Sequence, residues 1–439
     1  MNQEQIAQRA LDLHASGKTH EASKFISDKC GDAELSLPVA IAMARMATDI
    51  MRHDLSANYW AACHRLDPSN IAFRVNVAAS LHEIGDKTTA IKVAKAAIDI
   101  APNNTDALNI MGVITGDTTW YKKALKANPK NFNALNNLAQ HCKKAERRRL
   151  LKRALEIAPN DMSINVGYAL TLFGMGRHAD AWPHYEYRLQ NQRFSAIYLT
   201  EAKRWRGENL TCHSITVFAE QGVGDECMFL TGLGALRGAS RVVVACDERL
   251  VDLVARAYPW ADVVPCIERI NNGRKERRAD IPDTDYWMPA GDLWRHGNER
   301  GVSLHTDRAV EVPDNAIGLC WRSGLAGRPA WPGIDWAEKL VKQNPDKVFI
   351  NMQYKATKEE LERMTEIDNF HVVDGDLFMD IELNVAIANS CSLCVGPATA
   401  PMMFARCSGN DVRFVTGCKP WWANMWPGVR WCGLGDVFG

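Results

Sequence analysis

An all-α helical-repeat array followed by an α/β region of two lobes is the fold class that the sequence predicts. Helix ends that contain proline recur through the first half of the 439-residue chain, and short β-branched runs alternate with helical stretches in the second half. Alternation of strands and helices is typical of parallel sheets. We therefore expect a repeat domain over residues 1–205, an N-terminal lobe over residues 206–312 and a C-terminal lobe over residues 313–439.

Four related helix ends divide the first half of the chain, at residues 67–70, 101–104, 128–131 and 158–161. The step from Pro68 to Pro102 is 34 residues, and the next two steps, of 27 and 30, are shorter. A period of 34 is that of tetratricopeptide repeats. Alanines fall where helices must pack closely, at Ala78, Ala90, Ala97, Ala124 and Ala154. The pattern resembles a tetratricopeptide solenoid over about residues 3–190.

The second half has a different period. We expect strands at residues 214–219, 242–246, 317–321, 348–353, 393–396 and 412–416. Helices are expected at residues 227–236, 250–257, 335–342, 358–367, 380–390 and 399–407. Two such blocks predict two Rossmann-like lobes. In open α/β sheets a ligand binds outside the carboxyl ends of the strands, so we expect it in a cleft between the lobes.

Composition excludes several classes of function. Lys plus Arg and Asp plus Glu both total 52, and the sequence pI is near 7.2, so we expect no nucleic-acid partner. The first residues do not resemble an export signal, and no long apolar run suggests a membrane span, so a soluble, cytoplasmic protein is expected. Thirteen scattered cysteines indicate a reducing compartment. Cys391 and Cys394 form a C-x-x-C, for which core packing is favoured over metal or redox use.

The run Glu220-Gln221-Gly222-Val223-Gly224-Asp225 lies between an expected strand and an expected helix. It is neither a P-loop nor a full dinucleotide fingerprint, since Cys227 takes the third glycine position. One interpretation is a tight turn in which both glycines adopt positive φ and Asp225 only caps the helix. The other is a ligand site, in which Asp225 stays a carboxylate near the helix N-terminus and accepts a proton from a bound hydroxyl.

The C-terminal lobe supplies the complementary groups. Arg322 and Ser323 follow an expected strand, where Arg322 can hold a phosphate with two hydrogen bonds or be a solvated loop residue. Thr399 and Ala400 begin an expected helix after a turn of small residues, which suits a diphosphate.

Three segments carry a resemblance to a known family: EQGVGDE at residues 220–226, WRSG followed by WP at residues 321–332, and VGPATAPMMFA at residues 395–405. They resemble bacterial tetratricopeptide proteins with a glycosyltransferase family 9-like, heptosyltransferase-related domain. The arrangement is also similar to that of protein O-GlcNAc transferases. The resemblance implies a GT-B fold, an activated sugar on the C-terminal lobe, an acceptor on the N-terminal lobe and no metal or other cofactor. It assigns Asp225 as the base and matches Trp331-Pro332 and Thr399 to family positions.

The chain departs from the family pattern at two places. Ala398 and Met403 stand where the family has an aspartate and a histidine, and Pro329 replaces a lysine that often precedes Trp-Pro. Donor recognition therefore differs or activity is weakened, and Arg322 or Arg328 is expected to replace the lysine.

The expected function is inverting, metal-independent transfer of a sugar from a nucleoside diphosphate to a hydroxyl-bearing protein or glycan acceptor selected by the repeats. Asp225 is the expected catalytic base. The acceptor-side residues are Glu220, Gln221, Gly222 and Gly224, and the donor-side residues are Arg322, Ser323, Gln353, Thr399 and Ala400. The alternative is a repeat scaffold whose glycosyltransferase domain is a degenerate, non-catalytic binding module. A sugar-nucleotide epimerase is a less favoured alternative, because an epimerase would need no domain that binds an acceptor.

Three surface features remain. The basic runs at residues 143–153 and 274–278 are expected to be solvated faces, the second in a loop, with docking of an acidic partner or a phosphate-bearing acceptor as the alternative. The tryptophan-rich tail, residues 419–431, is expected either to cover the donor pocket or to pack between the lobes.

Overall fold

The computed structural model describes residues 1–30, 35–190, 196–271, 274–281, 283–297, 301–323, 332–415, 421–426, 429–435 and 437–438. The chain forms two compact units, Met1–Asn191 with Ile270–Arg274, and Gln192–Arg269 with Lys275–Gly439. No helix among the described residues is long and apolar enough to cross a membrane.

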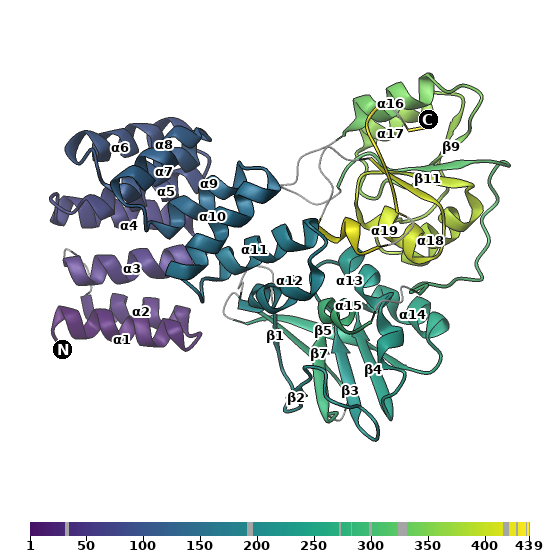
Figure 1. Ribbon diagram of the computed structural model, residues 1–439, viewed down its shortest axis with the longest axis horizontal. Helices are drawn as coiled ribbons and strands as arrows, with labels where there is room; N and C mark the ends of the chain where they lie inside the picture. Colours follow the sequence, from purple (N-terminus) through teal and green to yellow (C-terminus); the bar gives the residue numbers. More distant parts are fainter. Residues whose placement is uncertain are drawn as a thin grey trace. The chain divides into compact units, whose positions relative to one another are not determined.

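The first unit is a helical-repeat array, as predicted (Figure 1). Successive helices pack in pairs, and the pairs stack on one another. The helices are α1 (Gln3–Ala15), α2 (Thr19–Cys30), α3 (Leu37–Asp49), α4 (His53–Leu66), α5 (Ile71–Glu83), α6 (Lys87–Ile100), α7 (Thr105–Thr115), α8 (Thr118–Ala127), α9 (Phe132–Gln140), α10 (Lys144–Ile157), α11 (Met162–Gly174) and α12 (His178–Tyr185), followed by the 3-10 turn η1 (Glu186–Gln190).

The recurring proline motifs explain where the repeat helices begin. The last residue of each motif is the N-cap of the next helix, and its side-chain oxygen accepts a first-turn N–H; these residues are Asn70, Asn104, Asn131 and Asp161. Such caps contribute about 0.5–2 kcal/mol each. The five predicted alanines are all fully buried, as close helix packing requires.

The second unit begins with a seven-stranded sheet in the order β1-β6-β5-β4-β3-β7-β2 (Figure 1). Its strands are β1 (Ala196–Tyr198), β2 (Lys203–Arg204), β3 (Ser214–Phe218), β4 (Arg241–Cys246), β5 (Asp262–Asn271), β6 (Arg274–Ala279) and β7 (Tyr286–Pro289). The helical segments are α13 (Val223–Leu230), η2 (Leu233–Leu236), η3 (Glu248–Leu250), α14 (Val251–Ala257), η4 (Ala290–Asp292) and α15 (Leu293–His296).

Two sequence predictions need correction here. The repeat domain was expected to extend to residue 205, but β1 and β2 are the edge strands of the seven-stranded sheet. The basic run at residues 274–278 was expected in a loop, but it forms β6, which pairs with β1 in parallel. Both segments are short or highly charged, so neither shows the apolar pattern by which strands are recognised.

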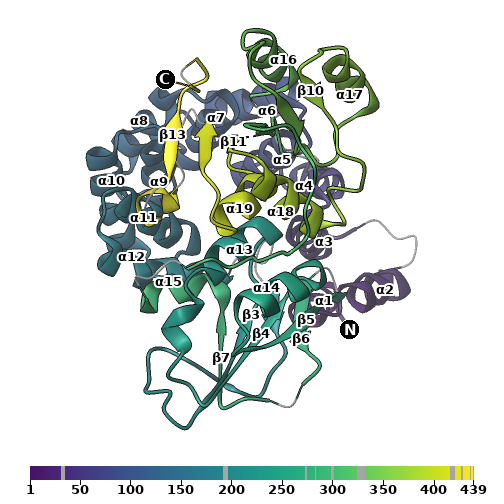
Figure 2. The same ribbon diagram turned by 90° about the vertical axis from the view of Figure 1, so that its right-hand side faces the viewer.

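A six-stranded parallel sheet completes the second unit (Figure 2). It contains β8 (Ile317–Leu319), β9 (Phe349–Asn351), β10 (Phe370–His371), β11 (Leu393–Gly396), β12 (Val412–Val415) and β13 (Arg430–Cys432). The helical segments are α16 (Ile334–Lys342), α17 (Lys358–Thr365), α18 (Ile381–Ser390), α19 (Ala400–Cys407) and η5 (Trp421–Asn424). The order β10-β9-β8-β11-β12-β13 reads 3-2-1-4-5-6, so the strand order reverses between β8 and β11.

The tryptophan-rich tail packs into this unit. Trp422 packs edge-on against Phe414 of β12 and against Trp426, whose ring centroid lies 5.9 Å from that of Trp294 in α15. Trp294 belongs to a helix beside the seven-stranded sheet. The tail therefore packs between the two lobes, which is one of the two arrangements expected for it. Cys391 and Cys394 are buried free thiols, as core packing requires.

Candidate functional site

The turn between β3 and α13 contains the first group of predicted site residues. Gln221 has φ +62°, and Gly222, the N-cap of α13, has φ −96°. The left-handed residue is therefore Gln221, and the interpretation that the glycines supply positive φ is wrong. Glu220 is buried and its Oε2 accepts the Gly291 N–H at 2.9 Å, whereas Asp225 is partly exposed in the first turn of α13.

Gly224 is where α13 meets α19. A Cβ placed on Gly224 would lie 2.9 Å from the Ala400 Cα and 3.5 Å from its nitrogen. Real Cβ atoms do not come that close to backbone, so a glycine is required by helix packing. This assigns Gly224 and Ala400 to a helix contact, where the sequence had placed them beside the acceptor and the donor.

The carboxyl ends of β8 and β11 meet at the point where the strand order of the six-stranded sheet reverses. Cys320 Sγ lies 3.4 Å from Thr399 Oγ1, and a Cβ on Gly396 would lie 2.6 Å from the Cys320 carbonyl oxygen. Thr399 is the N-cap of α19, and its side chain makes no capping hydrogen bond to that helix. The geometry thus brings Thr399 beside the start of the Arg322 loop.

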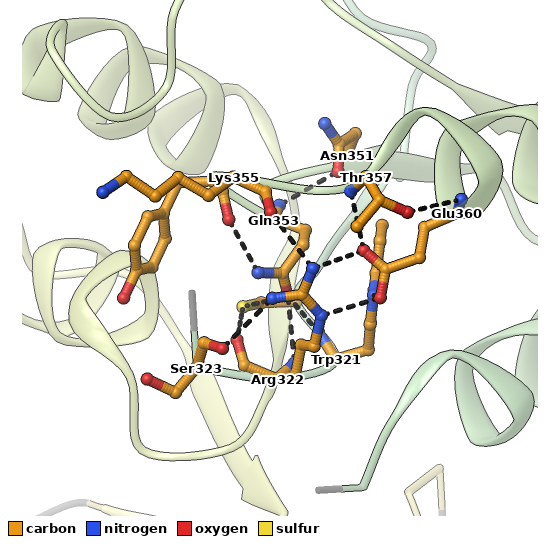
Figure 3. A network of polar contacts seen from close by, with 10 residues as sticks. Trp321, Arg322, Ser323, Asn351, Gln353, Lys355, Thr357 and Glu360 are labelled. Carbon is orange, nitrogen blue, oxygen red and sulfur yellow. Dashed lines mark hydrogen bonds and ion pairs between the residues drawn. The ribbon is translucent and has the colours of Figure 1, made fainter. Parts of the chain in front are cut away.

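Gln353 does not reach outward, although it was predicted to contact the donor. It is 2% exposed, and its Oε1 accepts the N–H groups of Trp321 and Arg322 at 3.1 and 2.9 Å (Figure 3). Its Nε2 donates to the Tyr354 carbonyl at 2.8 Å. Gln353 therefore positions the main chain after β8.

Replacement of Gln353 by leucine should destabilise the protein. The substitution leaves two largely buried N–H groups without their acceptor, at a cost of about 1–3 kcal/mol each. Urea unfolding should show a lower midpoint for Gln353→Leu and an unchanged one for Gln343→Leu, which replaces an exposed glutamine after α16. Equal midpoints for the two variants would contradict the positioning role.

The Arg322 guanidinium is already hydrogen-bonded to other residues of this chain. Its Nε and Nη2 donate to the two oxygens of Glu360 at 2.7 and 2.5 Å, Nη2 also to the Lys355 carbonyl, and Nη1 to the Ser323 carbonyl (Figure 3). Four of the five guanidinium N–H groups thus face protein acceptors. Arg322 was predicted to grip a phosphate with two hydrogen bonds, but in this arrangement it can offer at most one.

Glu360 accepts hydrogen bonds from Arg322 and from the Thr357 N–H. It is not among the site residues predicted from the sequence. Burial raises its pKa, but hydrogen bonds from Arg322 and the Thr357 N–H outweigh burial and hold the pKa below its usual value. Thr357 and Glu360 also form the capping box of α17. The T-x-x-E pattern before a helix is a recognised signal, so this part could have been found.

Several predicted positions lie outside the described residues. They are Arg328, Pro329 and Trp331. One pocket, of about 360 Å³, lies between the two sheets' helices and contains none of the predicted site residues among its lining: Glu248, Arg249, Asp252, Leu253, Met379, Asp380, Ile381 and Glu382.

The fold defines the class of protein as a helical-repeat array joined to an α/β unit of two largely parallel sheets. No family model matches the chain. The Caulobacter vibrioides protein named FlbA is 24% identical over an alignment of 460 positions, which covers 92% of this chain and 76% of FlbA.

Solved structures resemble the chain over a limited part. A crystal structure of MamA is 14% identical, covers 36% of this chain and 92% of its own, with a TM-score of 0.25. A thermophilic tetratricopeptide-repeat protein of Thermus thermophilus is 14% identical, covers 36% and 92%, and has a TM-score of 0.32. A tetratricopeptide-repeat protein of Parabacteroides merdae is 18% identical, covers 43% and 78%, and has a TM-score of 0.31.

Proposed function

We propose that the second unit is a GT-B-type glycosyltransferase that moves a sugar from a nucleoside diphosphate to a hydroxyl-bearing acceptor. The observation that carries the proposal is the meeting of α13 and α19 at their N-termini, through Gly224 and Ala400. Each helix begins directly after the carboxyl end of a parallel strand, β3 and β11. Free N–H groups and the positive ends of two helix dipoles favour an anion such as a diphosphate.

The chemistry follows from the residues around these two helix ends. Asp225 would take the proton of the acceptor hydroxyl while that oxygen attacks the anomeric carbon. The bond from the anomeric carbon to the diphosphate oxygen breaks, and the nucleoside diphosphate leaves with the electron pair. The N-terminus of α19, the Thr399 hydroxyl and the remaining Arg322 N–H would stabilise that charge. A single displacement inverts the anomeric centre, and the proposal needs no metal.

The repeats would select a protein or glycan acceptor, as helical-repeat surfaces commonly bind partners. The free cysteines are consistent with a reducing compartment, so the proposed location is the cytoplasm.

A repeat scaffold with a non-catalytic binding module is the second candidate. This candidate is favoured because Arg322 and Gln353, two of the predicted donor contacts, already form hydrogen bonds within the chain. A glycosyltransferase would bind a nucleotide sugar and turn it over. The scaffold would not turn one over and need not bind one.

Calorimetry with a panel of nucleoside diphosphates tests the proposal. We expect one of them to bind wild type, and Thr399→Val to weaken that binding by about tenfold, since a hydrogen bond to a charged group contributes about 1.5–3 kcal/mol. Ser392→Ala is the matched control, because it removes a hydroxyl just before β11, at the opposite end of that strand from Thr399. The absence of binding by every nucleotide would favour the scaffold.

A further inference from the structure

The basic run at residues 274–278 is part of the proposed site's supporting structure. As alternate residues of β6, Lys275 and Arg277 share one face, where both bind Glu268 of β5. Lys275 Nζ donates to Glu268 Oε1 at 2.7 Å, and Arg277 Nε donates to Glu268 Oε2 at 2.9 Å. The expectation of a solvated face is therefore wrong for Arg277, which is only 8% exposed.

Arg277 also reaches the turn that precedes α13. Its Nη1 donates to the Ala219 carbonyl and its Nη2 to the Gln221 carbonyl at 3.4 Å. These two carbonyls flank Glu220, whose carboxylate accepts the Gly291 N–H. The buried Arg277 guanidinium thus links β6 by hydrogen bonds to both ends of the turn at residues 219–221.

The turn needs such support because of its backbone conformation. Gln221 has φ +62°, a region that residues with a side chain occupy only when the surrounding structure holds them there. The next residue, Gly222, is the N-cap of α13, and Asp225 lies in the first turn of that helix. Any relaxation of Gln221 would therefore change where α13 begins and where the Asp225 carboxylate lies.

We propose that Arg277 is a positioning residue, which holds the residue 219–221 turn in the conformation that places Asp225 and the N-terminus of α13. Arg277 acts through the main chain and takes no proton. Its kinetic consequence rests on the proposed glycosyl transfer, whereas its effect on the turn does not. A 1 Å misplacement of a reacting group can lower a rate by about 10²-fold.

Arg277→Met and Arg277→Lys test this role against Lys275→Met. The matched control loses an ion pair to the same Glu268 but leaves the turn contacts in place. Hydrogen exchange should quicken at the amides of residues 226–228, which carry the first hydrogen bonds of α13, beginning with the Glu226 N–H to the Gly222 carbonyl. We expect at least about a tenfold change in Arg277→Met, a smaller one in Arg277→Lys, and none in Lys275→Met. In transfer assays kcat should fall by about 10–100-fold for Arg277→Met. The donor KM should change by a smaller factor, since the N-terminus of α13 shifts but the donor groups on α19 are untouched.

The outcomes separate the two proposals. If wild type turns over no nucleotide sugar, the glycosyltransferase proposal fails, and exchange at residues 226–228 alone decides the role of Arg277. Unchanged exchange in both Arg277 variants overturns the positioning role, as does an equal change in Lys275→Met. If Arg277→Met does not fold, the comparison moves to Arg277→Lys, which keeps the buried charge but can donate to only part of the guanidinium's acceptors.

Discussion

Asp225→Asn should reduce glycosyl transfer by about 10²–10⁴-fold, the contribution typical of a general base. The amide has nearly the same shape as the carboxylate, so α13 keeps its first turn and its approach to α19. An amide cannot accept the hydroxyl proton. Single-turnover rates with a saturating donor measure the loss directly, and calorimetry should show donor affinity within a fewfold of wild type.

The adjacent carboxyl provides a matched control. Glu226 is 3% exposed, and burial raises its pKa to about 8, so it is largely uncharged at neutral pH. Its Oε1 accepts the Asp247 N–H at 2.9 Å, an interaction that a glutamine retains. Glu226→Gln should therefore transfer at close to the wild-type rate. Equal rates for Asp225→Asn and wild type would remove Asp225 from the mechanism, and an equal loss in Glu226→Gln would make the effect structural.

The α/β core was predictable because its strands are short, β-branched and bounded by turns. β3, β4, β8, β9, β11 and β12 all lie within or next to the predicted runs. The predicted runs do not include β1, β2, β5, β7, β10 or β13. β8 and β9 were found because they lie inside longer predicted runs, whereas β2 and β10 have only two residues. Period-2 patterns cannot be recognised over so short a length.

The charged strand β6 was missed for another reason. Composition marks a run such as RKERR as solvated, since burial of a charge is costly without a partner. Glu268 supplies that partner from the neighbouring strand β5. Which strand lies beside β6 is a property of the sheet order, and the local sequence does not contain it.

The candidate site was predicted in part. The rule that ligands lie at the carboxyl ends of parallel strands selects residues after β8 and β11, and Thr399 does lie beside Cys320 at the start of the Arg322 loop. The same rule does not say which side chains are already occupied. Gln353 and Arg322 look like ligand contacts in sequence, but their partners, the main chain after β8 and Glu360, come from tertiary packing.

Gly224→Ala should destabilise the second unit and weaken donor binding together. Alanine is favoured over glycine inside a helix by about 1 kcal/mol. Here, however, its Cβ would lie 2.9 Å from the Ala400 Cα and 3.3 Å from the Ala400 Cβ. The Cα is backbone, which cannot rotate away, and overpacking costs about 1–3 kcal/mol. We expect a net loss of up to about 2 kcal/mol, seen as a lower urea midpoint.

Gly222→Ala separates this packing effect from any general intolerance of the turn. A Cβ on Gly222, at φ −96°, would meet only Asp225 Oδ2, at 3.8 Å, so alanine fits there without displacement. Because α13 and α19 must move apart only in Gly224→Ala, donor affinity should fall in that variant and stay close to wild type in Gly222→Ala. Ala400→Gly added to Gly224→Ala should restore part of the stability, since it removes the 3.3 Å contact but leaves the 2.9 Å one. A Gly224→Ala protein as stable as wild type, with unchanged donor affinity, would show that the two helix N-termini do not depend on this contact.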